Sequence, residues 1–190
     1  MRRLTYSMGM SLDGYIVGPD GGFDWSAPNE ELFQFATDEI RQVGVHFLGR
    51  RLYETMVYWE TVDQDPTISD LELEFAALWK SLTKVVFSST LTLVESGYHL
   101  AEGDLASEIA RWRAEPGEGD IAIGGATLAM QAVDLGLVDE FGLRIHPVLV
   151  GGGTPFFPRT EHREDLELVG SRVFDTGVVC LRYRATRNAA

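Results

Sequence analysis

The chain contains very little cysteine. Only one of its 190 residues is a cysteine, Cys180, so no intramolecular disulfide can form. Small secreted domains often depend on disulfides, and nothing here indicates such an oxidising compartment. Because Cys180 falls within an apolar, strand-like run, we expect it to lie in the core.

Basic residues and long apolar runs are also scarce. The 16 Lys and Arg residues are outnumbered by 29 Asp and Glu, which gives a formal net charge of −13 at pH 7. Such a chain is repelled by the phosphates of nucleic acids and anionic membranes, so we expect neither as a partner. No stretch approaches membrane-spanning length, and no apolar signal segment follows the first cations. We therefore expect a cytoplasmic protein with a single globular domain over residues 1–190.

The usual motifs of metal sites, hydrolases and kinases are missing. The four histidines are scattered at His46, His99, His146 and His162. This spacing does not make a zinc site, and a single cysteine cannot complete the pattern of the zinc deaminases. No Gly-x-Ser-x-Gly elbow or Walker phosphate loop occurs. We expect no metal ion, and a hydrolase or kinase has little support.

Strand-like and helix-like segments alternate along the chain. Apolar residues at three-to-four spacing predict helices within residues 29–43, 69–82, 105–112 and 128–135, and Ser69 with Glu72 matches a capping box. Strand patterns cover residues 4–10, 45–48, 84–89, 141–150, 166–174 and 178–184, with weaker signals at 91–94 and 98–100. This order predicts an α/β fold whose mostly parallel sheet has an antiparallel C-terminal edge.

A glycine pair marks the most informative turn. The apolar run at 121–123 ends in Gly124 and Gly125, and a helical pattern starts at once with Ala126 and Thr127. Without a Cβ at the glycines, a ligand can lie against the backbone, and the free N–H groups of the helix favour phosphate. Alternatively, the glycine pair only eases a tight strand-to-helix turn.

A second turn repeats this arrangement. Gly49 follows an apolar run, and the next residues, Arg50 and Arg51, enter a helix. Cations at that end of a helix oppose its dipole, which suggests an anion between them, although both could simply be solvated. Ser88 and Ser89 end another predicted strand, and their hydroxyls suit a phosphate or ribose as well as a plain turn. Because ligands bind beyond the carboxyl ends of parallel strands, these turns predict one site for a ligand with several phosphates.

These segments, in this order and spacing, resemble the dihydrofolate reductase-like superfamily. Within it, the chain is similar to the C-terminal reductase domain of the bifunctional riboflavin-biosynthesis deaminase-reductase, and the resemblance covers nearly the whole chain. It is carried by Ser11-Leu-Asp-Gly-Tyr-Ile, Leu48-Gly-Arg-Arg-Leu-Tyr-Glu, Val86-Phe-Ser-Ser-Thr, Ile123-Gly-Gly-Ala-Thr-Leu, Leu137-Val-Asp-Glu-Phe and His146-Pro-Val-Leu-Val-Gly-Gly-Gly-Thr-Pro-Phe-Phe. The resemblance implies a three-layer α-β-α fold and a homodimer.

The resemblance also implies NADPH as the cofactor. Arg50 and Arg51, with Ser88 and Ser89, are expected to hold the region of the adenosine 2′-phosphate. The pyrophosphate is expected to lie at the turn of the glycine pair, on Gly124, Gly125, Ala126 and Thr127, with Gly49 on the neighbouring turn. The family's usual threonine after the two basic residues is Leu52 here, which removes one hydroxyl contact and leaves the backbone contacts.

Two carboxylates are candidates for the substrate side. Trp25-Ser-Ala-Pro-Asn-Glu30 resembles the Trp-x-x-Pro-x-acid segment of dihydrofolate reductases, in which the carboxylate bonds a pterin-like ring and assists protonation. A buried Glu30 would suit that role, although an acidic residue in a first helical turn is favoured by the dipole alone. The family loop places Asp13 close to substrate or nicotinamide, or Asp13 with Gly14 forms only a turn. Residues 151–153 are interpreted as a strand connection in preference to a substrate loop.

The sequence therefore predicts an NADPH-dependent oxidoreductase. Its acceptor would be a C=N or C=O group in a pterin-like, pyrimidine or other small molecule, with Glu30 or an ordered water supplying the proton. Two alternatives remain open at this point. One is the pyrimidinone reductase step of riboflavin synthesis, and the other is a nucleotide-binding module that does no catalysis.

Overall fold

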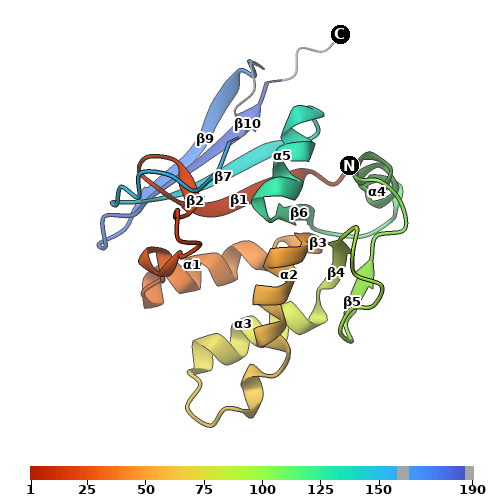
Figure 1. Ribbon diagram of the computed structural model, residues 1–190, viewed down its shortest axis with the longest axis horizontal. Helices are drawn as coiled ribbons and strands as arrows, with labels where there is room; N and C mark the ends of the chain where they lie inside the picture. Colours follow the sequence, from red (N-terminus) through yellow and green to blue (C-terminus); the bar gives the residue numbers. More distant parts are fainter. Residues whose placement is uncertain (158–162, 187–190) are drawn as a thin grey trace.

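An eight-stranded sheet forms the centre of the molecule (Figure 1). The computed structural model describes residues 1–157 and 163–186. The strand order is β5-β4-β3-β6-β1-β7-β10-β9, in which the first six strands are parallel and β10 runs antiparallel to both of its neighbours. The strand bounds are β1 Leu4–Ser11, β3 Val43–Gly49, β4 Thr83–Phe87, β5 Tyr98–Leu100, β6 Asp120–Gly124, β7 Glu140–His146, β9 Leu166–Val173 and β10 Val179–Ala185. The predicted parallel sheet with an antiparallel C-terminal edge is confirmed.

Helices cover both faces of this sheet (Figure 1). On one face lie α1 (Glu30–Ile40), α2 (Arg50–Met56) and α3 (Asp70–Ser81), and the buried core there joins helix residues such as Trp79 to Leu48 and Val86. On the other face, α4 (Leu105–Ala114) and α5 (Ala126–Asp134) pack on alternate residues of β1, β3 and β6. Short 3₁₀ turns are η1 (Asp24–Ser26), η2 (Val57–Glu60) and η3 (Val62–Gln64), and β2 (Tyr15–Val17) pairs with β8 (Thr154–Pro155). Three layers result, as expected.

Several boundaries differ from the sequence prediction. The strand predicted over 141–150 ends at His146, because Pro147 lacks the N–H that would continue the ladder. The weak strand signal at 91–94 is wrong, since this segment is irregular apart from a bend at Thr92, whereas the signal at 98–100 is β5. The capping box of Ser69 and Glu72 is confirmed, and Cys180 is buried as expected.

One buried lysine stands out in the layer beneath α3. The Lys84 side chain is completely buried, and its Nζ donates to the Trp79 carbonyl oxygen at 2.8 Å. The same Nζ lies 3.1 Å from Glu60 Oε1 and 4.9 Å from the centre of the Tyr98 ring. Lys84 thus neutralises a largely buried carboxylate and binds a carbonyl at the C-terminal end of α3.

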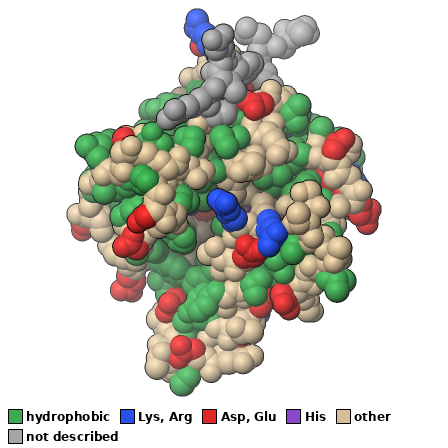
Figure 2. All heavy atoms as spheres, in the orientation of Figure 1, with side chains coloured by type: hydrophobic (Ala, Val, Ile, Leu, Met, Phe, Trp, Pro, Cys, Tyr) green, Lys and Arg blue, Asp and Glu red, His purple; other side chains and the backbone are tan. Residues whose placement is uncertain are grey.

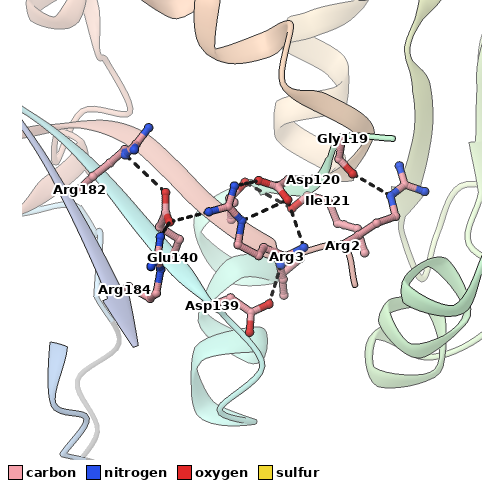
Figure 3. A network of polar contacts seen from close by, with 11 residues as sticks. Arg2, Arg3, Gly119, Asp120, Ile121, Asp139, Glu140, Arg182 and Arg184 are labelled. Atoms are coloured by element: carbon pink, nitrogen blue, oxygen red, sulfur yellow. Dashed lines mark hydrogen bonds and ion pairs between the residues drawn. The ribbon is translucent and has the colours of Figure 1, made fainter. Parts of the chain in front are cut away.

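The edge of the sheet at the start of the parallel strands is closed by charge pairs. Figure 3 shows guanidinium groups converging on Glu140, the first residue of β7. Glu140 contacts Arg3 at 3.2 Å, Arg184 at 3.3 Å and Arg182 at 3.4 Å, and Arg3 also pairs with Asp120 at 2.7 Å. These bonds join β6, β7 and β10 to the residue that precedes β1.

In the described ranges, no helix has the length and apolar character needed to cross a bilayer.

Candidate cofactor and substrate site

The predicted phosphate-binding turns meet at the opposite edge of the sheet. Gly49 and Gly124 are the last residues of two neighbouring strands, β3 and β6, and Leu48 lies in register with Gly124. On the other side of β3, Gly49 lies in register with Phe87, the residue before Ser88. The structure therefore brings all three turns to the carboxyl end of the parallel strands, where α/β proteins bind their ligands.

Gly125 is required for the two turns to touch. Its φ of +90° lies in the left-handed region that side chains rarely adopt, and a Cβ there would lie 3.3 Å from both Cα and N of Gly49. A Cβ on Gly124 would overlap the Leu52 side chain. The interpretation of the pair as a tight structural turn is therefore supported. This packing is also compatible with a ligand, since it sets the start of α5 beside the start of α2.

The helices that begin at this edge have unusual N-termini. Side chains cap the other three α-helices, with Asn29 on α1, Ser69 on α3 and Asp104 on α4. By contrast, α2 begins at Gly49 and α5 at Gly125 without a side-chain cap. The first backbone N–H groups of α5, from Ala126 onward, thus lack a cap, and Thr127 is exposed beside them. Such donors at the positive end of a nine-residue helix fit a pyrophosphate.

Arg50 joins the helix start to the serine turn. Its Nη1 donates to Thr90 Oγ1 at 2.8 Å, and its Nε donates to Glu54 at 2.7 Å. Ser88 Oγ accepts the N–H groups of Thr90 and Leu91, whereas Ser89 is exposed. Arg51 is exposed too, and its guanidinium has no hydrogen bond or ion pair within the described ranges. Figure 2 shows basic side chains in the middle of this face, where Figure 1 places the start of α2.

A polar strip runs along the sheet beneath α1. On β1 the residues of this face are Thr5, Ser7, Gly9 and Ser11, and their register partners on β7 are Glu140, Gly142, Arg144 and His146. The opposite face of the same strands is apolar, with residues such as Leu4, Tyr6 and Phe141 in the core. Arg144 spans the strip, donating to Ser7 at 3.2 Å and to Glu39 of α1 at 2.5 Å. This strip ends at the same sheet edge as the phosphate-binding turns.

His146 and Trp25 lie at that end of the strip. The two rings meet edge to face with 5.6 Å between their centres, and His146 is only 5% exposed. Burial, and secondarily the charge of Arg144, lower the pKa of His146, so its imidazole is neutral at pH 7. Trp25 Nε1 is buried without a hydrogen-bond partner in the described part of the chain.

Glu30 differs from the expectation of a buried carboxylate. It is the first residue of α1 and is exposed to solvent. Its position matches the alternative in which the helix dipole favours an acidic first turn. The burial expected of a catalytic carboxylic acid is absent at Glu30, and its part in proton transfer stays a prediction.

Asp13 ties two loops together. Its carboxylate accepts the Ser11 hydroxyl at 2.6 Å and the N–H groups of Gly151 at 2.8 Å and Val150 at 3.2 Å. The hydrogen bond from Ser11, followed by those from the two amides, lowers the pKa of Asp13. An ionised carboxylate with this many donors suits loop anchoring and is a poor proton donor. The same bonds support the interpretation of residues 151–153 as a connection.

His146, at the end of the polar strip, was not predicted as part of the candidate site. The four histidines lie far apart in the sequence, so their spacing gave no indication of a shared role. The usable signal was the alternation of polar residues on β1 and β7, which puts His146 on the face shared by Gly9 and Ser11. Within the described ranges, no group of three or more His, Cys, Asp or Glu residues could hold a metal ion.

A known protein family matches almost the full length of the chain. The model of the RibD C-terminal domain family matches residues 2–180. The uncharacterized protein YyaP of Bacillus subtilis (strain 168) is 32% identical over 182 residues, which cover 96% of this chain and 94% of YyaP.

Solved structures show the same fold. RibD of Acinetobacter baumannii superposes with a TM-score of 0.69 at 18% identity, over 98% of this chain and 58% of that one. The dihydrofolate reductase of Enterococcus faecalis, complexed with NADP(H), superposes with a TM-score of 0.65 at 14% identity, over 97% of each chain. At such identities the likeness establishes the three-layer fold alone, which agrees with the expected superfamily.

Proposed function

Because the chain belongs to the RibD C-terminal domain family, we propose that residues 1–190 form one cytoplasmic NADPH-dependent reductase domain. The substrate is a pterin, a pyrimidine or another small molecule with a carbonyl or imine group. The observation that carries this proposal is the meeting of the uncapped start of α5, the Gly49–Gly125 contact and Arg50 at one sheet edge. These groups suit the pyrophosphate and the 2′-phosphate of NADPH.

Different parts of the site are proposed to bind the cofactor and the substrate. Ala126 and Thr127 present backbone N–H groups to the pyrophosphate, and Arg50, Arg51, Ser88 and Ser89 surround the adenosine phosphate. When bound, NADPH supplies the hydride. The polar strip beneath α1 receives the substrate, and the proton comes from Glu30 or from an ordered water on the open side of the strip.

The family match also supports a second candidate, the reduction of 5-amino-6-(5-phosphoribosylamino)uracil in riboflavin biosynthesis. A screen of NADPH oxidation tests both. It should include dihydrofolate, the deaminated ribosylaminopyrimidine, and small aldehydes and quinones. Turnover of the ribosylaminopyrimidine alone would select the second candidate. Tight NADPH binding without any turnover would favour a cofactor-binding module that does no catalysis.

We expect Arg50→Ala to weaken NADPH binding selectively. A charge-assisted hydrogen bond to the 2′-phosphate contributes roughly 1.5 to 3 kcal/mol before screening, so the loss should be about tenfold or more for NADPH and small for NADH. Titration calorimetry with both cofactors measures it. Arg163→Ala is the control. This side chain is 86% exposed and lies just before β9, the outermost strand on the other side of the sheet from β5. Equal wild-type affinities for NADPH and NADH would contradict the assignment.

For the proton donor, Glu30→Gln is the direct test. The amide keeps the shape of the side chain but cannot cycle a proton, so hydride transfer should slow while NADPH affinity stays the same. General acid-base assistance is typically worth about 100- to 10,000-fold. Single-turnover NADPH oxidation at several pH values gives the answer, with Glu31→Gln on the next position of α1 as the control. Full activity and an unchanged pH profile in Glu30→Gln would leave solvent as the proton source.

The sheet edge at β9 is proposed to form a homodimer. Leu166, Leu168 and Val173 are 36%, 52% and 72% exposed. They lie on β9, which has a ladder partner on one side only in the described part of the chain. Light scattering at micromolar concentration should give twice the mass of the chain, and Leu168→Glu should give the monomer mass. Glu167→Gln, on the other face of β9, should leave the dimer intact. A monomeric wild-type chain would refute the proposal.

A further inference from the structure

We propose that a cavity beneath α1 binds a small aromatic carboxylate, at a site separate from the glycine turns assigned to NADPH. The cavity has a volume of about 190 Å³ and lies between α1 and the strands β7, β10 and β9. An apolar cavity of about 150 Å³ is enough to hold benzene, so a single ring fits here. This inference goes beyond the proposed reductase function and does not depend on it.

A glycine on the outermost strand leaves the cavity open. On the face of the sheet turned toward α1, Arg182 of β10 lies in register with Gly142 of β7 and Gly170 of β9. A Cβ on Gly142 would overlap the Ser7 side chain, so packing requires that glycine. A Cβ on Gly170 would meet only Arg182, at 3.8 Å, which is an ordinary contact. Strand positions favour β-branched and aromatic residues, and a glycine there often marks a place where a ligand approaches.

The residues that line the cavity carry an excess of positive charge. Among the described residues, Arg144, Arg172 and Arg182 line it together with one acidic residue, Glu39. Three guanidinium groups against one carboxylate leave a formal charge of +2, in a chain whose net charge is −13. Two of the three are paired, since Arg144 contacts Glu39 at 2.5 Å and Arg172 contacts Glu31 at 2.7 Å. An anion is therefore the favoured ligand.

Arg182 is the group available to bind that anion. Its Nε lies 3.4 Å from Glu140 Oε1, on a carboxylate that Arg3 and Arg184 also contact. The two Nη atoms of Arg182 have no partner in the part of the chain that the structure describes. A guanidinium presents its N–H groups in a planar fork that matches a carboxylate with two parallel hydrogen bonds.

The walls of the cavity define the rest of the ligand. Phe35 of α1 and Cys180 of β10 line it, and both belong to the apolar cluster between this helix and the sheet. The Arg172 guanidinium lies over the rings of Phe174 and Phe35, 4.5 Å and 5.6 Å from their centres. Apolar walls cannot replace the hydration of a free phosphate ion, whereas they can bury the ring of an aromatic acid.

The cavity lies away from the edge where the phosphate-binding turns meet. Gly142 is four residues before His146, the last residue of β7, which corresponds to about 13 Å along the strand. Arg144 lies between them and donates to Ser7 and to Glu39, so that it bridges the sheet and α1. An acid bound beneath α1 should therefore not compete with NADPH.

Fluorine NMR titration of the full chain tests the choice of ligand. The probes are 4-fluorobenzoate and its neutral analogue of equal size, 4-fluorobenzamide. We expect a Kd of about 1 mM or lower for the acid, and binding about tenfold or more weaker for the amide, which lacks the charge. Added NADPH should leave the Kd of the acid unchanged. Equal binding of the two probes, no binding of the acid, or its displacement by NADPH would each refute the inference. The comparison of the probes without NADPH is valid whether or not the chain is a reductase.

Three variants locate the binding site. Gly170→Ile fills the cavity with a residue that strands favour, so acid binding should fall tenfold or more without a loss of stability in urea unfolding. Arg182→Met keeps the stem but removes the fork, and should also weaken the acid about tenfold. Arg184→Met is the matched control, because Arg184 contacts the same Glu140 and does not line the cavity. Equal losses in Arg182→Met and Arg184→Met, or full binding in Gly170→Ile, would overturn the proposal.

Discussion

Gly125→Val is expected to abolish NADPH binding. The substituted residue must hold a φ of +90°, and its Cβ would press on Cα and N of Gly49 at 3.3 Å. The two turns must then separate, which moves the first N–H groups of α5 away from Arg50. Losing two charge-assisted hydrogen bonds of about 1.5 to 3 kcal/mol each corresponds to a loss of affinity of about 100-fold or more. Titration calorimetry measures it.

Gly136→Val provides a matched control for backbone strain. Gly136 follows the C-terminal end of α5 with a φ of +62°, and a Cβ there would meet no atom within 4 Å. Both variants should lose about 1 to 3 kcal/mol of unfolding free energy because both force a side chain into the left-handed region. Only Gly125→Val should lose the cofactor. Circular dichroism that reports global unfolding of Gly125→Val would show that the glycine pair matters mainly for the fold.

Removing the buried charge of Lys84 should be the most damaging change to stability. In Lys84→Met the Glu60 carboxylate, 19% exposed, loses its cation, and the Trp79 carbonyl loses its donor. Breaking one side of a buried ion pair typically costs about 3 to 5 kcal/mol, a large part of the stability of an ordinary domain. Urea unfolding followed by tryptophan fluorescence gives the change in the free energy of unfolding.

A surface pair nearby supplies the comparison. Lys80 on α3 pairs with Asp63 at 2.7 Å, but these side chains are 32% and 48% exposed. Lys80→Met should therefore cost no more than about 1 kcal/mol. Adding Glu60→Gln to Lys84→Met should recover part of the loss, because no charge is then left buried. Equal losses for Lys80→Met and Lys84→Met would contradict the importance of burial.

Local patterns were enough to predict the sheet and the cofactor edge. The alternation of apolar strands and amphipathic helices predicts parallel pairing, and each glycine turn directly follows its strand. Thus Gly49, Ser88 and Gly124 could be assigned to one edge before any pairing was known. The capping box of Ser69 depends only on Glu72, three residues further along the chain, so a local sequence pattern was enough to predict it.

Features that depend on contacts between distant segments could not be predicted in this way. Asp13 was placed near the substrate, but its partners Val150 and Gly151 come from a loop far along the chain. The catalytic role proposed for Glu30 required burial, whereas the helix dipole alone also favours an acidic first turn, and the sequence did not decide between a buried and an exposed Glu30. The ring contact of Trp25 with His146 depends on the pairing of β1 with β7, which no local pattern specifies.

The central place of β1 determines when this chain can fold during synthesis. β1 is made first, but its ladder partners begin at Ile121 in β6 and at Glu140 in β7. The ion pairs around Glu140 also require Arg182 and Arg184 of β10. Closing such long loops costs entropy before any contact repays it, so folding is slow relative to helical proteins. During synthesis, β1 therefore has no ladder partner until β6 and β7 have been made. We expect chaperones to be most important for this chain during that interval.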